Sequence, residues 1–338
     1  MAGIVGYGVY VPKYRIKAEE YIKAWGNFAA DGVKEKSVVG CDEDVVTMAI
    51  EASNNAIKSA GIDPKNINTV YLATTSAPYA EKPSSVTVAA AIGAEGDVRT
   101  ADFTTSTKAG TAALLACLER VKSDDSGRCG LIVASDAPAA APDSSLEHAL
   151  GGAAAAFIIG KKNIIATIDK SYSLSMETLG ERFRKRDEPY IRDLELRVQH
   201  LQNAITATIK NLQKSLNLEP KDFAYVVVQQ PDGRAAARIA GKLGFSKKQL
   251  STGNLAEYTG DVGAASTLLS LAAVLESAKH GEKILLASYG SGSDAICITV
   301  GAPLAAPKIE IKEYLQNKEY IDYVKYLKLK KVLSTFRT

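Results

Sequence analysis

An internal repeat is the feature of this 338-residue chain that most constrains its fold. The segment GTAALLACLERV, beginning at Gly110, leads into CGLIVAS, and GAASTLLSLAAVLES, beginning at Gly263, leads into KILLAS. Twenty-five positions separate Gly110 from Ser135, and the same number separates Gly263 from Ser288. Upstream of each copy another apolar run ends in a polar loop, VYLATTS in the first half and VVVQQPDG in the second. Chance similarity explains two alike small-residue helices more readily than it explains equal spacing through both the helix and the following strand. We therefore predict a duplicated unit whose loops converge where the halves meet.

Short β-rich runs alternate with longer helical patterns, which predicts an α/β fold with βαβ units and a largely parallel sheet. The middle strands are continuous apolar runs, as expected for strands buried on both faces. The predicted strands are Gly3–Tyr10, Thr69–Ala73, Cys129–Ser135, Ala153–Ile159, Ile164–Asp169, Ala224–Val228, Lys283–Ser288 and Ala295–Val300. The predicted helices are Asp44–Ser59, Ser84–Ile92, Gly110–Lys122, Asp193–Leu216, Gly233–Leu243, Gly263–Ala278 and Ile311–Leu329.

Charge and composition argue against several classes of protein. The chain has 41 basic and 38 acidic residues, a balance that does not favour nucleic acid as the main partner. The run GGAAAAFIIG is shorter than the ~18–20 residues of a membrane span, and the first residues do not resemble a secretory signal. The four cysteines lack any CxxC spacing and are expected to be free thiols, not disulfides or metal ligands. We expect a cytoplasmic protein without a bound metal.

Ten short motifs occur in a fixed order along nearly the whole chain. They are IVGYGVYVPKYRI at Ile4, DEDVVTMAIEA at Asp42, PYAEKPSS at Pro78, TKAGTAAL at Thr107, GGAAAAFIIG at Gly151, QPDGR at Gln230, KLGF at Lys242, GN at Gly253, YTG at Tyr258 and SYGSGSDA at Ser288. Together they resemble the archaeal branch of 3-hydroxy-3-methylglutaryl-CoA (HMG-CoA) synthase in the thiolase superfamily.

The resemblance implies a thiolase-like fold with duplicated halves in an αβαβα five-layer arrangement. On that basis residues 1–165 form an N-terminal half and 218–303 a C-terminal half. Residues 166–217 are expected to form an insertion with a long helix, and 304–338 a basic tail.

The family's reaction, as the resemblance implies it, begins when a cysteine accepts an acetyl group from acetyl-CoA. The resulting acetyl group adds to acetoacetyl-CoA, and hydrolysis releases HMG-CoA for the mevalonate route to isoprenoids. A histidine near the second thioester and a glutamate acid/base complete the catalytic set. No cofactor is implied beyond coenzyme A itself, whose thioesters are the expected ligands.

All three catalytic positions are replaced here, although the neighbouring motif residues are kept. The family's cysteine directly precedes Lys-Ala-Gly-Thr, where this chain has Thr107. The glutamate lies three positions before Pro-Tyr-Ala-x-Lys-Pro, where this chain has Thr75. The histidine precedes Gln-Pro, where this chain has Gln229. A threonine hydroxyl needs an adjacent base to attack, and a glutamine amide cannot take its proton. We therefore predict that acyl transfer by the family mechanism is lost.

Other histidines and cysteines are weaker candidates for catalysis. His148, His200 and His280 are not next to any motif, and Cys117 lies among leucines on a helix. The family's long insertion is also replaced by a shorter, highly charged stretch, in which ERFRKRDE, beginning at Glu181, is interpreted as a solvated surface.

Residues that would contact substrate or CoA follow from the resemblance. Some of these residues are glycines in turns that match the family's oxyanion-side loops. Glycine there lets backbone N–H groups approach a carbonyl oxygen, although the fold alone also explains these glycines. A basic cluster after the Gln-Pro loop, which includes Lys247 and Lys248, would bind CoA phosphates or simply form a solvated helix face. The candidates are Asn254, Tyr258, Ser288, Gly290, Gly292, Arg234, Arg238 and Lys242.

The sequence leaves two functions open. The first is a catalytically inactive HMG-CoA synthase relative, kept as a structural or acyl-CoA-binding subunit. The second is an active HMG-CoA synthase or another acyl-CoA condensing acyltransferase with a rearranged site. The resemblance implies a homodimer, or a heteromer with an active paralogue. An acetoacetyl-CoA thiolase and an OB-fold zinc-ribbon protein are further implied partners.

Overall fold

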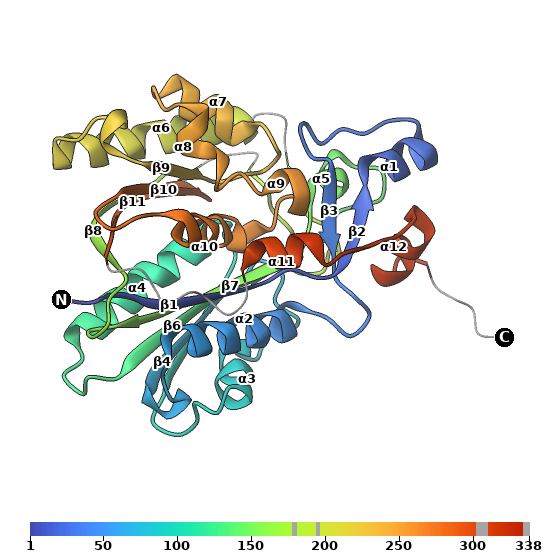
Figure 1. Ribbon diagram of the computed structural model, residues 1–338. Helices are drawn as coiled ribbons and strands as arrows, with labels where there is room; N and C mark the ends of the chain where they lie inside the picture. Colours follow the sequence, from blue (N-terminus) through green and yellow to red (C-terminus); the bar gives the residue numbers. More distant parts are fainter. Residues whose placement is uncertain (178–180, 194–196, 302–309, 334–338) are drawn as a thin grey trace.

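The computed structural model describes residues 1–177, 181–193, 197–301 and 310–333 (Figure 1). A nine-stranded sheet has the order β5-β4-β6-β7-β1-β8-β11-β10-β9, and a three-stranded sheet stands beside it. Only Gly3 and Ile4 of β1 pair with β8, so the large sheet consists of two parts that join at one short contact.

The two parts have the same strand pairing, one in each half of the chain. The first contains β1 (Gly3–Tyr10), β4 (Ile67–Ala73), β5 (Arg99–Phe103), β6 (Cys129–Asp136) and β7 (Ala153–Gly160). The second contains β8 (Ala166–Ser175), β9 (Tyr225–Val228), β10 (Lys283–Tyr289) and β11 (Gly292–Val300). β4 and β6 are parallel and β7 runs antiparallel to β6 and β1; β9, β10, β11 and β8 repeat this pattern. The predicted duplication is confirmed.

The prediction of a largely parallel sheet is wrong, because antiparallel pairs outnumber parallel ones among the described strands. A strand buried on both faces is a continuous apolar run in either direction, so its sequence does not reveal its orientation. Strand β8 pairs with β11, which puts residues 166–175 in the sheet of the C-terminal half and not in an insertion. The other domain boundaries stay predictions.

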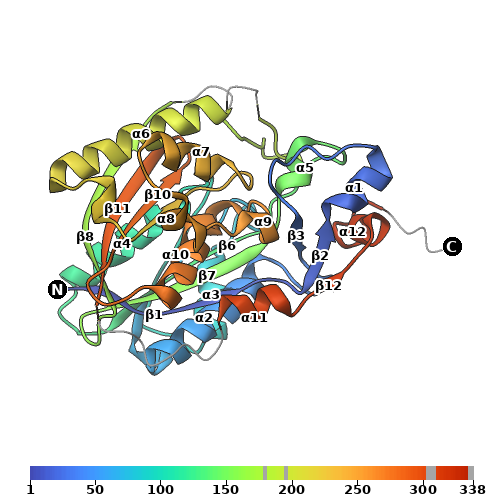
Figure 2. The same ribbon diagram turned by 45° about the horizontal axis from the view of Figure 1, so that its top comes forward.

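Five layers alternate as predicted (Figures 1 and 2). The outer helices α2 (Val45–Ala60) and α3 (Ser84–Ala91) pack on the first part of the sheet. The central helices α4 (Ala109–Ser123) and α10 (Ser266–Ser277) form one core with both parts. The opposite outer layer contains α6 (Arg197–Leu216), α7 (Ala235–Lys242) and α8 (Lys247–Ser251).

The central layer requires the small residues of the repeat. A Cβ atom on Gly110 would lie 2.5 Å from the carbonyl oxygen of Ala264, in the short helix η3 (Gly263–Ala265) that precedes α10. The helix starts of the two halves therefore touch through their backbones, which a side chain at Gly110 would prevent.

A small lobe flanks the layers, at the right of Figure 1. Its sheet contains β2 (Tyr14–Lys17), β3 (Glu35–Val38) and β12 (Glu319–Tyr320), with α1 (Ala18–Trp25), α5 (Ser145–Ala149) and α12 (Tyr323–Leu329) around it. The single helix predicted over Ile311–Leu329 is wrong. It is divided into α11 (Ile311–Gln316), β12 and α12, because Asp322 caps a new helix by accepting from Lys325 N at 2.7 Å.

The remaining short elements are α9 (Ala256–Thr259), η1 (Pro64–Asn66) and η2 (Pro220–Asp222). The sequence missed these, together with β2, β3, β5, β12, α1, α5 and α8, because such short segments carry little periodicity. Within the described ranges, no helix combines the length and the apolar character needed to cross a bilayer.

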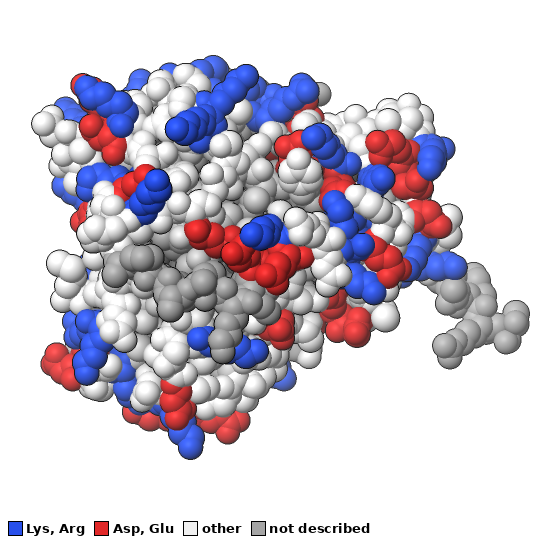
Figure 3. All heavy atoms as spheres, in the orientation of Figure 1, with Lys and Arg blue, Asp and Glu red and all other residues white. Residues whose placement is uncertain are grey.

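Acidic side chains gather over α11 at the centre of the face in Figure 3. A carboxylate that bonds to the first residue of α11 predicts a pH effect on stability. Glu276 Oε1, in the last turn of α10, accepts from Ile311 N at 2.9 Å. Burial, followed by the Glu310 carboxylate, raises the pKa of Glu276 to about 7, although the Ile311 N–H opposes this shift. The folded state therefore holds an extra proton between pH 4.5, the carboxyl's ordinary pKa, and about pH 7.

Stability is therefore expected to fall as pH rises through this window, by about 1–2 kcal/mol after allowance for solvent screening of this partly exposed carboxyl. Urea unfolding at pH 5 and pH 8 measures the difference. The variant Glu276→Gln should show a smaller difference between the two pH values; an equal difference in both proteins would contradict this assignment.

Candidate functional site

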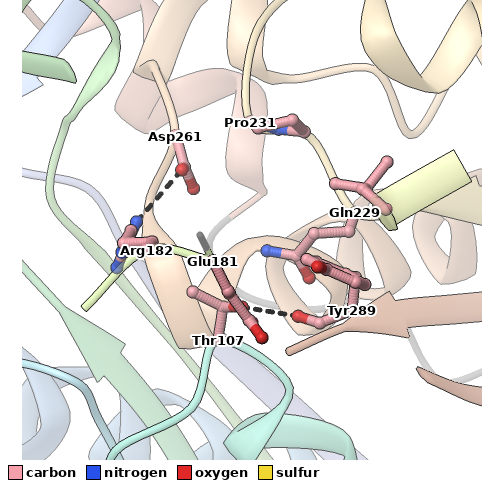
Figure 4. A pocket seen from close by; sticks show the side chains of 8 residues that line it. Thr107, Glu181, Arg182, Gln229, Pro231, Asp261 and Tyr289 are labelled. Atoms are coloured by element: carbon pink, nitrogen blue, oxygen red, sulfur yellow. Dashed lines mark hydrogen bonds and ion pairs between the residues drawn. The ribbon is translucent and has the colours of Figure 1, made fainter. Parts of the chain in front are cut away.

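A pocket opens at the ends of β9 and β10, opposite the start of α4, and both halves contribute to it (Figure 4). The space inside, including its open mouth, is about 320 Å³. The eight residues that line it are Thr107, Glu181, Arg182, Leu201, Gln229, Pro231, Asp261 and Tyr289. Two of the three predicted catalytic positions, Thr107 and Gln229, thus face one pocket, and the expectation that loops converge between the halves is confirmed.

Thr107 lies in the turn before α4, and its hydroxyl already makes a hydrogen bond within the protein. Its Oγ1 donates a hydrogen bond to the carbonyl oxygen of Tyr289 (Figure 4). Two residues earlier, Thr105 has φ of 68°, which is unfavourable for a β-branched residue. A Cβ atom on Gly290 would lie 2.9 Å from Thr107 Oγ1, so the β10–β11 turn packs directly on this hydroxyl.

Thr75, the third predicted position, contacts the pocket through Arg182. Its hydroxyl accepts from Arg182 Nη2 at 3.0 Å and donates to Asp136 Oδ2 at 2.7 Å. Asp136 is fully buried at the end of β6, where it also accepts from Thr75 N at 3.2 Å and Ala264 N at 2.9 Å. The hydroxyls of Thr74 and Ser76 are two more donors to the same carboxylate. Thr75 therefore belongs to a network that joins the two halves.

Gln229 is 3% exposed, and the nitrogen of its side-chain amide makes a hydrogen bond. Its Nε2 donates to the carbonyl oxygen of Gly263 at 3.1 Å. Its Oε1 is buried with no hydrogen-bond partner among the described residues. This amide accepts and donates hydrogen bonds but does not act as a base.

The interpretation of ERFRKRDE as a solvated surface is wrong for its first two residues. Arg182 Nη1 lies 3.2 Å from Asp261 Oδ2, and the two side chains are only 8% and 5% exposed. Glu181 accepts from both the backbone N and the hydroxyl of Ser291, each at 2.7 Å. No sequence signal distinguished Glu181 and Arg182 from their exposed neighbours, because the residues that they contact lie far away along the chain.

None of the remaining predicted substrate residues is among those that line the pocket. Ser288 and Thr111 share a hydrogen bond of 2.6 Å, and Thr111 also donates to Asp294 at 2.7 Å. Gly292 has φ of 117°, a turn conformation that favours glycine. Asn254 Nδ2 donates to Gly233 O at 3.5 Å. Tyr258 is 37% exposed, with Lys34 Nζ 5.6 Å from its ring centroid.

The basic cluster after the Gln-Pro loop is largely paired with acidic side chains. Arg234 lies 2.8 Å from Asp31, and Arg238 lies 3.1 Å from Asp31 and 3.2 Å from Asp232. Lys242 donates to Gln202 at 2.9 Å. Two carboxylates beside the arginines weaken the case for a phosphate site, since they repel an anion. The CoA assignments of these residues and of Asn254, Ser288 and the glycines stay predictions.

Neither a cysteine nor a histidine is among the residues that line the pocket. His148 is buried in the small lobe, where burial and then Lys36 lower its pKa. Cys117 and Cys297 are buried and Cys41 is exposed, and burial raises the pKa of the Cys117 thiol. Among the described residues, no group of three or more His, Cys, Asp or Glu side chains is placed to hold a metal.

Chemically, the pocket offers hydroxyl, amide, carboxylate and guanidinium groups, and most of them already bond to the protein. Its carboxylates, Glu181 and Asp261, contact Ser291 and Arg182 respectively. The described residues that line the pocket thus supply neither a thiolate nucleophile nor an imidazole.

Comparisons with known proteins agree over nearly the whole chain. The chain is 40% identical to hydroxymethylglutaryl-CoA synthase of Methanocaldococcus jannaschii over 98% of its own length and 99% of that protein. It is 39% identical to that of Methanopyrus kandleri over 98% and 97% of the two lengths. Residues 212–301 match the family model "3-Oxoacyl-[acyl-carrier-protein (ACP)] synthase III C terminal".

Solved structures show the same fold. MvaS in complex with 3-hydroxy-3-methylglutaryl coenzyme A has a TM-score of 0.87 at 21% identity, over 98% of this chain and 91% of that chain. The 3-oxoacyl-[acyl-carrier-protein] synthase III of Aquifex aeolicus has a TM-score of 0.80 at 21% identity, over 88% and 100%. The predicted thiolase-like fold is confirmed.

Proposed function

The chain belongs to the hydroxymethylglutaryl-CoA synthase family, and from that premise we propose that it lacks the family's acyl-transfer activity and serves as a structural or acyl-CoA-binding subunit. The observation that carries the proposal is how the side chains at the three catalytic positions are used. Thr107 bonds to Tyr289 O, Thr75 bonds to Asp136, and Gln229 bonds to Gly263 O.

These bonds serve the fold and engage the side chains that would otherwise take part in proton transfer. Thr107 would need a base close to its Oγ1 to attack a thioester, but its proton is directed at a backbone carbonyl. Gln229 cannot remove that proton at physiological pH. Loss of one member of a catalytic set commonly costs several orders of magnitude, and the remaining members contribute little without it.

Acyl transfer can be tested with acetyl-CoA and acetoacetyl-CoA, using the M. jannaschii relative as the positive control. We expect no stable acetyl adduct on this chain by intact mass, and HMG-CoA formation at least ~10⁴-fold slower than in the control. A stoichiometric adduct that disappears in Thr107→Ala would refute the proposal.

One observation favours a second function, an active acyltransferase with a rearranged site. Glu181 lines the same pocket as Thr107 and is a carboxylate that the family comparison did not anticipate. As a general base it would have to leave Ser291 and reach the threonine hydroxyl. In that case Glu181→Gln should abolish any adduct formed by the unmodified chain.

The partners are also proposals. Among the described strands, the edge strand β5 pairs only with β4, so a second subunit has a strand edge to pair with. A homodimer, a heteromer with an active paralogue, and a complex with an acetoacetyl-CoA thiolase and an OB-fold zinc-ribbon protein would all suit a structural subunit. Copurification from the source cell would test each of them.

A further inference from the structure

The segment 181–192, which we call the strap, is anchored at both of its ends. Phe183 and Arg192 exchange backbone hydrogen bonds of 2.8 Å, which closes the segment into a loop. Ile191 N donates to Ala139 O at 3.0 Å, and the Ile191 side chain is buried with Ala140, Leu146 and Leu150. The far end of the strap is therefore held by an apolar cluster outside the pocket.

The near end of the strap lines the pocket beside Thr107. Arg182 bonds to Thr75 in the N-terminal half and to Asp261 in the C-terminal half, and its side chain is 8% exposed. Glu181 bonds to Ser291 in the turn whose Gly290 packs on the Thr107 hydroxyl. Two adjacent strap residues thus bridge three loops around Thr107, and Figure 4 shows Glu181 beside Thr107 with Arg182 directed at Asp261.

We infer that the strap narrows the access to residue 107, so that small electrophiles, including the acyl end of a thioester, reach it slowly. The inference rests on the proposed function only in treating this pocket as the inherited acyl site. Arg182 is its main anchor, because removing its side chain removes the bonds to both halves at once. The strap then also has a structural use, since its bonds tie the inter-half segment to both halves.

Access can be measured with a cysteine reporter in the full-length chain. Thr107→Cys supplies a thiol at position 107 in the pocket. Iodoacetamide labelling of each cysteine is then followed by peptide mass spectrometry. Exposed Cys41 is the internal standard for full access, and buried Cys117 and Cys297 report unfolding. We expect Thr107→Cys to label at least tenfold more slowly than Cys41, and Thr107→Cys/Arg182→Ala to regain at least tenfold in rate.

The matched control is Thr107→Cys/Arg184→Ala. Arg184 belongs to the same strap, but its guanidinium donates to Glu188 O on the surface, so labelling should stay within twofold of Thr107→Cys. If Arg182→Ala unfolds the chain, Cys117 labels too. Glu181→Ala then takes its place, because it releases the exposed Ser291 turn and keeps the contact between Arg182 and Asp261, and the same tenfold gain is expected.

Fast labelling of Thr107→Cys in the otherwise unchanged chain would overturn the inference, and so would an unchanged rate in folded strap variants. These rates do not depend on catalysis. An acetyl adduct on the natural chain would defeat the proposed function alone, whereas an open pocket without an adduct would defeat the strap alone.

Discussion

Replacing Asp136 with alanine is expected to destabilise the protein by about 4 kcal/mol or more. The Asp136 carboxylate is fully buried and accepts from Thr75 N, Thr75 Oγ1 and Ala264 N, as well as from the hydroxyls of Thr74 and Ser76. Alanine leaves these donors without an acceptor, and each unsatisfied buried donor costs about 1–3 kcal/mol, although the costs do not add fully. Urea unfolding measures the loss.

The matched control for Asp136→Ala is Asp97→Ala. Asp97 is fully exposed and pairs with Arg128 at 3.2 Å, so its loss should change the free energy of unfolding by no more than about 0.5 kcal/mol. Asp136→Asn keeps one acceptor oxygen and should fall between the two. An Asp136→Ala protein as stable as the control would show that the network beneath the pocket does not hold the halves together.

Replacing Gly151 with alanine is expected to cost about 3 kcal/mol or more and to displace Asp261 from the pocket. A Cβ atom on Gly151 would lie 1.9 Å from the carbonyl oxygen of Thr259, which is backbone and cannot rotate away. Gly151 N also donates to Asp261 O at 2.9 Å, so the added methyl group pushes apart the two loops that fix Asp261. Thermal unfolding measures the stability loss.

Gly241→Ala is the control for Gly151→Ala because it adds the same methyl group in open space. Gly241 lies within α7, and a Cβ atom there would meet nothing within 4 Å. Alanine should stabilise the helix by about 0.5–1 kcal/mol. If both variants changed stability equally, the close approach of residues 151 and 259 would not be a constraint on the fold.

Both predictions concern a pocket whose polar groups support the structure. Thr75 shares Asp136 with Ala264 of the opposite half, and Arg182 joins Thr75 to Asp261. In an active site such groups would have to remain available to a substrate. Their bonds within the protein support the proposal that this pocket serves the structure.

The α/β fold class and the duplication could be predicted because they depend on patterns within each half, whereas the layer order was implied by the family resemblance. The repeat at Gly110 and Gly263 has small residues at both helix starts, and these residues meet in the central layer. Apolar runs such as Ala153–Gly160 identified buried strands but not their direction, because burial on both faces looks the same in parallel and antiparallel strands. The helix predicted over Ile311–Leu329 failed because one capping side chain, Asp322, restarts the chain there.

By itself the sequence determined the duplication, the buried strands and the family resemblance. It also identified Thr75, Thr107 and Gln229 as the residues at the three motif positions. Only the tertiary structure decided that Glu181 and Arg182 enter the pocket. Their partners Ser291, Thr75 and Asp261 lie 110, 107 and 79 positions away along the chain, and whether a charged side chain is buried depends on such distant partners. The local sequence, a run of alternating charge, does not identify these partners. It therefore resembles a solvated surface, and the burial becomes evident only in the folded structure.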